Sequence, residues 1–214
     1  MKERAVVMGK FYYDFKIDDE GFIKIKNLPG KVELLSAPRE KQEEKYYSYV
    51  LHDTDIKNAI SYLEKALQVE DVIEKEALFE AAVIKYIKCF TSSKSGRKQL
   101  IPSKVYNNIQ GDPLGCHMKF KEIRDSYIAH DQNDFLTVRM GLVLQDGELK
   151  GVVCPPMQSV FYYEDNINIL LALCKITCSF VENILNEEID KIHEKYKDEW
   201  DIKIIKSFPK MKEH

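Results

Sequence analysis

Hydrophobic and polar positions follow different periods in different parts of the chain. Residues 1 to about 50 contain short runs in which apolar or aromatic residues alternate with polar ones, a pattern typical of β-strands. The clearest runs cover residues 11–17, 21–25 and 32–35, and turn-forming residues separate them. This part of the chain therefore predicts a small antiparallel meander, and the charged residues that follow predict an exposed connection over residues 36–52.

From about residue 53 the apolar positions recur at helical spacing. The pattern predicts two consecutive helices within residues 53–91, with a break near 69–71. Asp112 and Pro113 are a natural N-cap and first-turn pair for a further helix over residues 113–131. The last long helix is predicted over residues 165–196, followed by a C-terminal tail over residues 198–214.

Between the last two helices the period changes to that of strands. Residues 135–143 and 150–153 flank the pair Asp146-Gly147, which is a strong turn signal, so they predict an inserted β-hairpin. The segment from Cys154 to Met157, with two prolines, is expected to end its second strand. A short helical turn is predicted over residues 105–111.

Composition limits the class of protein. The chain has 214 residues, 44% of them hydrophobic and 31% charged, which is enough for one sizeable core. It contains no run of 18 apolar residues, and its first residues lack the apolar stretch of a signal peptide. These features predict a soluble cytoplasmic protein that does not associate with membranes.

The five cysteines, an odd number, mostly lie within apolar runs, as reduced core cysteines do. Cys174 and Cys178 share a predicted helix face but lack a second Cys or His pair at ligand spacing, so packing is favoured over zinc and no metal or cofactor is expected. The net charge of −3 excludes a broad positive field, so any nucleic-acid site must be local. The strongest local positive patch is the loop 91–98, with Lys94, Arg97 and Lys98 as candidate RNA contacts; its alternative role is a solvated connection.

One segment combines an arginine with a histidine near the end of a predicted helix. Arg124 and His130 differ by six positions, which in a regular α-helix places them about 120° apart around the axis and about 9 Å apart along it. Two groups that act on one phosphate must converge on it, because the arginine neutralises charge while the histidine moves a proton. Convergence therefore requires either unwinding of the helix near Ala129 or a twofold-related second copy. The alternative is a buried histidine and a surface arginine paired with Asp125 or Glu122.

The residues from Phe120 to His130, Phe-Lys-Glu-Ile-Arg-Asp-Ser-Tyr-Ile-Ala-His, resemble the signature of the HEPN superfamily (higher eukaryotes and prokaryotes nucleotide-binding domain). That signature is an arginine, four to six residues of which the first is commonly polar, and a histidine; Asp125 fills the polar position. Residues 76–90 are similar to a core helix of the same group. The resemblance covers residues 55–197, whereas the N-terminal meander and the hairpin are not part of a minimal HEPN bundle.

The resemblance implies a mainly α, up-and-down helical bundle, here with a small N-terminal β-meander (residues 1–52) and a hairpin at about 135–153 inserted into a helical domain of residues 53–197. It also implies a homodimer in which Arg124 and His130 of both copies line one cleft. The implied activity is metal-independent RNA cleavage by a toxin or antiphage defence effector, with RNA as substrate and an antitoxin or regulatory protein as a candidate partner. Asp125 and Tyr127 are expected in support, Tyr127 mainly through packing, and Lys121 is a further candidate RNA contact.

Two other classes of function compete with this one. A non-catalytic dimeric module that binds RNA, a nucleotide or a protein partner is suggested by the modest charge and the added β elements. A nucleotidyltransferase is disfavoured, because the sequence lacks a Gly-Ser pair followed by paired aspartates that would hold metal and triphosphate. The sequence also lacks a Gly-rich phosphate loop, a GxSxG elbow and an HExxH motif.

Overall fold

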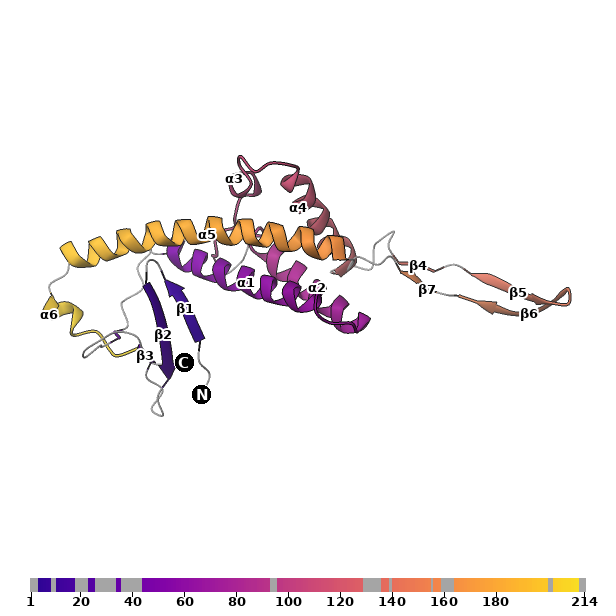
Figure 1. Cartoon of the computed structure of the whole chain (residues 1–214), viewed down its shortest axis with the longest axis horizontal. Coiled ribbons are helices and arrows are strands. Elements are labelled where there is room, and N and C mark those ends of the chain that lie inside the picture. The colour runs from indigo at the N-terminus through magenta and orange to yellow at the C-terminus, as the bar shows by residue number, and fades with distance from the viewer. Residues whose placement is uncertain are drawn as a thin grey trace. The chain divides into compact units, whose positions relative to one another are not determined.

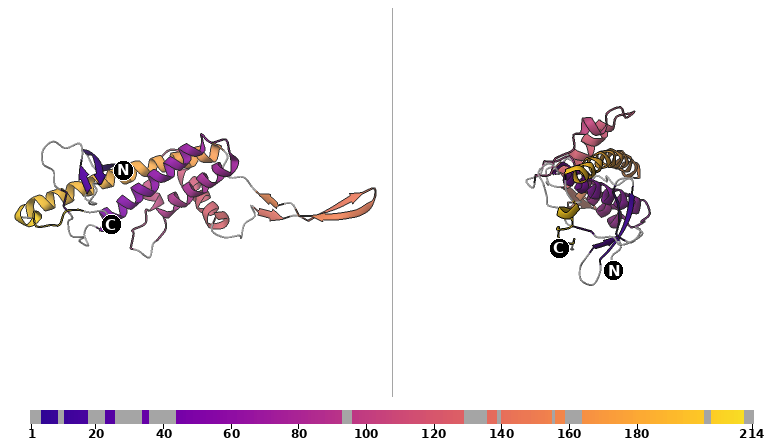
Figure 2. Two further views of the ribbon diagram at one scale, coloured as in Figure 1. Left: turned by 90° about the horizontal axis from the view of Figure 1, so that it is seen from below. Right: turned by 90° about the vertical axis from the view of Figure 1, so that its left-hand side faces the viewer.

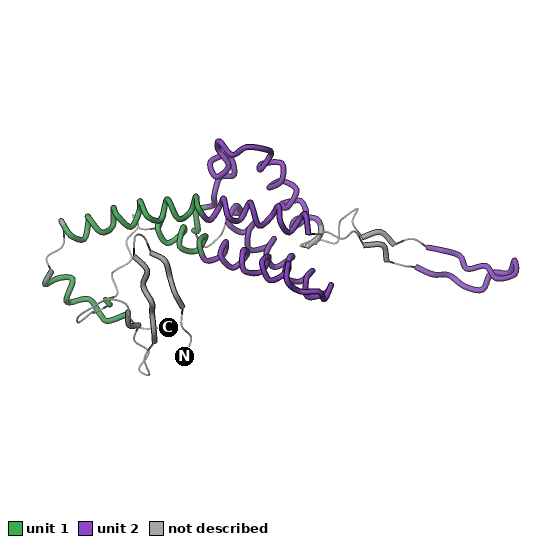
Figure 3. The backbone as a smooth tube through the Cα atoms, in the orientation of Figure 1, with its two compact units in different colours: residues 1–53, 93–98, 179–214 green, residues 54–92, 99–178 purple. Residues whose placement is uncertain are grey.

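The computed structural model describes residues 4–8, 11–17, 23–25, 34–35, 44–92, 96–128, 136–138, 140–154, 156–158, 164–199 and 202–211. Helices make up most of these residues (Figure 1), which confirms the prediction of a mainly helical, bundle-like architecture. The chain divides into two compact units, drawn in different colours in Figure 3. Unit 1 contains Met1–Asp53, Ser93–Lys98 and Ser179–His214, and unit 2 contains Thr54–Ser92 and Gln99–Cys178.

Unit 1 includes a three-stranded antiparallel sheet in the order β1-β2-β3, as the predicted meander requires. Its strands are β1 (Arg4–Met8), β2 (Phe11–Ile17) and β3 (Ile23–Ile25). The strand predicted over residues 32–35 is wrong where the structure describes it. Leu35 instead forms an isolated antiparallel bridge with Lys210, and the amide of Met211 donates to the carbonyl of Leu34 at 3.0 Å.

Helix α1 (Glu44–Ala66) begins earlier than the sequence pattern indicates, so the exposed connection predicted up to residue 52 is wrong from Glu44 onwards. The reason is that the inward face of its first turns is polar. Ser48 and His52 are 4% and 0% exposed, respectively. They lie four positions apart and therefore on one face of the helix. Buried polar residues escape a search for hydrophobic periodicity.

Unit 2 contains the predicted pair of helices with a break between them. After α1 ends, Asp71 caps α2 (Val72–Lys88), and its Oδ1 accepts a hydrogen bond from the amide of Glu74 at 2.8 Å. The short helix α3 (Pro102–Val105) precedes α4 (Pro113–Glu122), whose predicted N-cap Asp112 accepts from the amide of Gly115 at 2.8 Å. Figure 2 shows these helices from two further sides.

The core of unit 2 forms where α2 and α4 pack together. Phe79 and Phe120 meet edge to face with ring centroids 6.3 Å apart, and both are almost completely buried. Such aromatic pairs stabilise a fold beyond the area that they bury. Asp55 of α1 contacts α2, because Lys85 donates to it at 2.9 Å and Lys88 lies 3.2 Å from its other oxygen.

The longest helix is α5 (Glu164–Glu199), which agrees with the predicted range of 165–196, and the tail contains the short helix α6 (Ile202–Ile205). By length and composition α5 could cross a membrane, since its most apolar window has a mean hydropathy of 1.5. This is weak evidence, because the core helix of a soluble protein passes the same test. In unit 2, Ile167, Leu170 and Cys174 of α5 are indeed buried within the protein.

The predicted hairpin is confirmed in strands β5 (Gly141–Gln145) and β6 (Glu148–Val153). Asp146 and Gly147 form its turn with φ values of 52° and 81°, the left-handed conformation that two-residue hairpin turns need. The second strand ends at Val153, directly before Cys154, as predicted. The sequence pattern does not indicate the further short strand that follows. Pro156 opens β7 (Pro156–Gln158), which pairs with β4 (Leu136–Val138), and proline is tolerated as the first residue of an edge strand.

One face of the β5–β6 hairpin is apolar and open. Leu142 lies opposite Val152 and Leu144 opposite Leu149, and a bulge at Lys150 separates the two pairs. Since residues two apart on a strand share a face, these four side chains point to the same side. Each of them is 54–65% exposed.

Candidate functional site

Arg124 lies on a π-helix rather than on the regular α-helix that the sequence predicts over residues 113–131. Helix α4 ends at Glu122, and residues Ile123–Ile128 form the π-helical segment η2. Ile123 is 2% exposed and keeps the start of this segment on the core. In a π-helix the backbone bonds join residues five apart, and such turns occur frequently at functional sites.

The guanidinium of Arg124 is held by two groups. Its Nη2 donates to Oγ1 of Thr91 at 3.1 Å, and its Nε lies 3.0 Å from Oδ1 of Asp125. A guanidinium carries five N–H groups, so three remain for other ligands if each contact takes one. The side chain is 27% exposed. Arg124 therefore combines a fixed position with partial exposure to solvent.

Asp125 connects this arginine to a second cation. Its Oδ2 lies 3.3 Å from Nζ of Lys121, while its Oδ1 faces Arg124. One carboxylate thus draws two positive side chains together, one on each oxygen. The cluster of Lys121, Arg124 and Asp125, which carries a net positive charge, brings together three of the residues that the sequence singles out.

The side chains of three other expected site residues cannot be placed against this cluster. His130 and Lys94 lie outside the described residues, and of Tyr127 the structure describes the backbone in η2. The expected separation of about 120° between Arg124 and His130 assumes α-helical steps, whereas the segment from Ile123 to Ile128 is π-helical. The helix departs from regular geometry at Ile123, six residues before the unwinding considered near Ala129.

Arg97 is buried, although the sequence suggests a solvent-facing basic loop. It is 9% exposed, and its Nε and Nη2 lie 3.1 Å and 2.5 Å from Nδ1 of His52. The carbonyl of Lys98 accepts a hydrogen bond from Nε2 of His52 at 2.7 Å, which leaves Nδ1 as the acceptor for Arg97. Arg97 is therefore a buried residue of unit 1 and does not contribute to the positive surface. The side chain of Lys98 remains exposed.

A second histidine, which the sequence analysis does not single out, lies in the core of unit 2. His117 of α4 is 2% exposed, and its Nδ1 lies 2.8 Å from the hydroxyl of Tyr86. Tyr86 in turn contacts Tyr106, which contacts Thr177 of α5 at 3.1 Å. The signal in the sequence is the spacing of His117 from Phe120, three positions, which places both side chains on one face of α4.

The hydrogen bonds that link His117, Tyr86, Tyr106 and Thr177 all point in one direction. The hydroxyl of Thr177 donates to the carbonyl of Leu173 at 2.8 Å, so it accepts from Tyr106. Each tyrosine hydroxyl has a single hydrogen, so Tyr106 accepts from Tyr86, and Tyr86 accepts from Nδ1–H of His117. These directions place a hydrogen on Nδ1 of His117.

The pKa values of these groups are consistent with a neutral network. Burial, with a further contribution from the charge of Lys121, lowers the pKa of His117 to about 4. Burial raises the pKa of Tyr106 to about 12 and raises the pKa of Tyr86. At neutral pH these four hydrogen-bonded side chains carry no charge. Their hydrogen bonds connect α2, α4, α5 and the C-terminal end of α3.

The cysteines largely follow the prediction. Cys89 and Cys174 are buried and free, and burial raises the pKa of the Cys174 thiol. Cys154 is exposed, contrary to the expectation for a cysteine in an apolar run.

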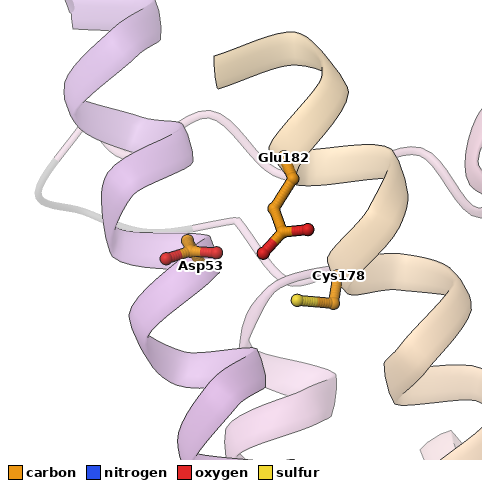
Figure 4. Close-up of side chains that lie close together, drawn as sticks. All are labelled: Asp53, Cys178 and Glu182. Atoms are coloured by element: carbon orange, nitrogen blue, oxygen red, sulfur yellow. The ribbon is translucent and has the colours of Figure 1, made fainter. Parts of the chain in front are cut away.

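Two carboxylates in unit 1 lie close together. Asp53 of α1 and Glu182 of α5 have oxygens within 4.8 Å of one another, and Figure 4 also draws Cys178, which precedes Glu182 by one helical turn on α5. Paired acidic groups are common in proteins without a bound ion. This pair therefore does not define a metal site.

Comparison with known proteins adds no family to this picture. The chain matches no protein-family model, no curated protein and no solved structure. The fold and the site define a helical-bundle-like protein with an anchored, partly exposed arginine in a π-helix. The resemblance to HEPN proteins thus depends on the motif residues themselves.

Proposed function

We propose that this protein is a metal-independent endoribonuclease of the HEPN type. The observation that carries the proposal is the geometry of Arg124, whose guanidinium is fixed by Thr91 and Asp125 and whose side chain is partly exposed to solvent. Arginine binds phosphate through two parallel N–H···O bonds, and a fixed guanidinium loses less entropy when it does so. Lys121, drawn in by Asp125, adds a second positive charge for the RNA backbone.

The proposed reaction is an internal transfer at phosphorus. The ribose 2′-oxygen attacks the adjacent phosphorus, the new O2′–P bond forms, and the bond from phosphorus to the 5′-oxygen breaks. One proton leaves the 2′-hydroxyl and one is added to the leaving 5′-oxygen; His130 transfers one of the two and solvent the other. Arg124 stabilises the charge that develops on the phosphate. The products are a 2′,3′-cyclic phosphate and a 5′-hydroxyl, and the proposed reaction requires no metal ion.

The test is cleavage of RNA by the purified protein in EDTA, with end-group analysis of the products. We expect cleavage by the parent protein and a loss of roughly 100-fold or more in Arg124→Ala and His130→Ala, as removal of a transition-state contact or a proton-transfer group produces. Arg124→Lys keeps the charge but not the two-pronged geometry and should recover only part of the rate. Equal cleavage by all variants, or none by the parent protein, contradicts the proposal.

The proposed site is composite, formed by two copies of the chain. Mixing Arg124→Ala with His130→Ala should then restore part of the activity, because one copy supplies the histidine and the other the arginine. Absence of recovery, with mixed dimers shown to form, assigns both groups to one chain. In cells, we propose a toxin or antiphage role, so expression of the parent protein should arrest growth while Arg124→Ala should not.

A second candidate function, a non-catalytic binding module, is favoured by a different observation. The open apolar face of the hairpin, formed by Leu142, Leu144, Leu149 and Val152, is a feature of surfaces that contact partners. Binding of RNA or a protein partner without cleavage, and unchanged in His130→Ala, would support this function instead.

A further inference from the structure

We infer that Thr91 is a positioning residue for Arg124, an inference that rests on the proposed ribonuclease site. Thr91 follows the C-terminus of α2, and its Oγ1 accepts a hydrogen bond from Nη2 of Arg124 at 3.1 Å. It belongs to the polar, basic loop 91–98, in which the sequence analysis selects only the basic residues as candidate RNA contacts. The contact joins α2 to η2 across 33 positions in the sequence.

The hydroxyl of Thr91 has a fixed orientation. Its Oγ1 donates its single hydrogen to the carbonyl of Ile87 at 2.9 Å, so only its lone pairs can face Arg124. The carbonyl of Ile87, near the end of α2, also accepts from the amide of Phe90 at 2.9 Å, so Thr91 adds a further hydrogen bond there. The Thr91 hydroxyl therefore donates its hydrogen at the end of α2 and accepts a hydrogen bond from Arg124 with its oxygen.

The surroundings of Thr91 favour a cation for a second reason. The C-terminal end of a helix carries a partial negative charge, and Thr91 lies three residues beyond Lys88, the last residue of α2. Asp125 holds the guanidinium at a second atom, Nε. Thr91 and Asp125 together fix both the direction and the rotation of the Arg124 plane, which determines where its remaining N–H groups point.

The neighbouring residue provides a matched control. Ser92 is exposed, as Thr91 is, and differs from it by one position. Thr91→Val removes the hydroxyl while keeping the branched shape, Thr91→Ser keeps the hydroxyl, and Ser92→Val removes a hydroxyl next to the contact. A role in positioning predicts an effect for the first variant alone.

Three measurements test the inference. For cleavage in EDTA, we expect Thr91→Val to lose roughly 3- to 10-fold and the two other variants to stay within about twofold of the parent, as expected for one hydrogen bond. For binding of 2′-O-methyl RNA, which has no free nucleophile, we expect Thr91→Val to weaken affinity in the parent background but not in Arg124→Ala. By NMR, the order parameter of the Arg124 Nε–H bond should fall toward about 0.6 in Thr91→Val and remain higher in Thr91→Ser.

Failure of the inference and failure of the proposed function give different results. If the parent protein cleaves RNA, Arg124→Ala does not, and Thr91→Val matches the parent, the inference is overturned and the ribonuclease remains. If Thr91→Val weakens binding equally in both backgrounds, Thr91 acts on the fold rather than on Arg124, and the inference is again overturned. If the parent protein neither cleaves nor binds RNA, the proposed function fails, and the order parameter alone decides whether Thr91 positions Arg124.

Discussion

The buried imidazole of His117 makes stability depend on pH in a defined window. Its pKa is about 4 in the folded protein, against 6.5 for an unperturbed histidine. Between these values the unfolded chain binds a proton that the folded protein does not, so folding stability falls as pH decreases from about 6.5 to about 4 and is retained above 6.5. The full difference corresponds to about 3 kcal/mol.

At pH 5 the loss is a large part of this total. The unfolded histidine is then almost fully protonated while the folded one is about one-tenth protonated, which amounts to about 2 kcal/mol of stability lost relative to pH 7.5. The physical cause is that an imidazolium would be buried at 2% exposure beside the charge of Lys121. A change of this size is a large fraction of the stability of a typical domain.

The assay is urea unfolding at pH 7.5 and pH 5.0, followed by circular dichroism, for the parent protein and for His117→Asn. Asparagine can place an N–H near the position of Nδ1 and donate to Tyr86, but it does not titrate in this range. Other groups titrate equally in both proteins, so the difference between their pH dependences isolates His117. The parent should lose about 2 kcal/mol more than His117→Asn; a difference below about 0.5 kcal/mol, near the error of the extrapolation, would refute the reasoning.

Two further predictions concern stability at neutral pH. Asp112→Ala should cost about 1 kcal/mol in urea unfolding because it removes the cap of α4, while Asp112→Asn should cost much less; equal losses would show that the cap bond is not what matters. Phe120→Ala, at a fully buried position, should cost roughly 3–5 kcal/mol, whereas Leu144→Ser on the 65% exposed hairpin face should change stability by about 0.5 kcal/mol or less. A large loss in Leu144→Ser would mean that this face is covered in solution.

The sequence by itself determined the elements whose signals are local. The cap at Asp112, the break between α1 and α2, and the Asp146-Gly147 turn all depend on residues a few positions apart, so they can be recognised without the fold. The start of α1 could not be recognised, because its inward residues Ser48 and His52 are polar and gain their partners from the loop at Arg97 and Lys98.

The candidate site likewise combines features that are local in the sequence with features that only the fold creates. The sequence singled out Arg124, Asp125 and Lys121, because their spacing on one helix is a local property. Only the tertiary structure brought Thr91 to Arg124, buried Arg97, enclosed His117 among Tyr86 and its neighbours, and replaced α-helical by π-helical geometry at Ile123. These features arise from contacts between residues far apart in the chain, which no local pattern encodes.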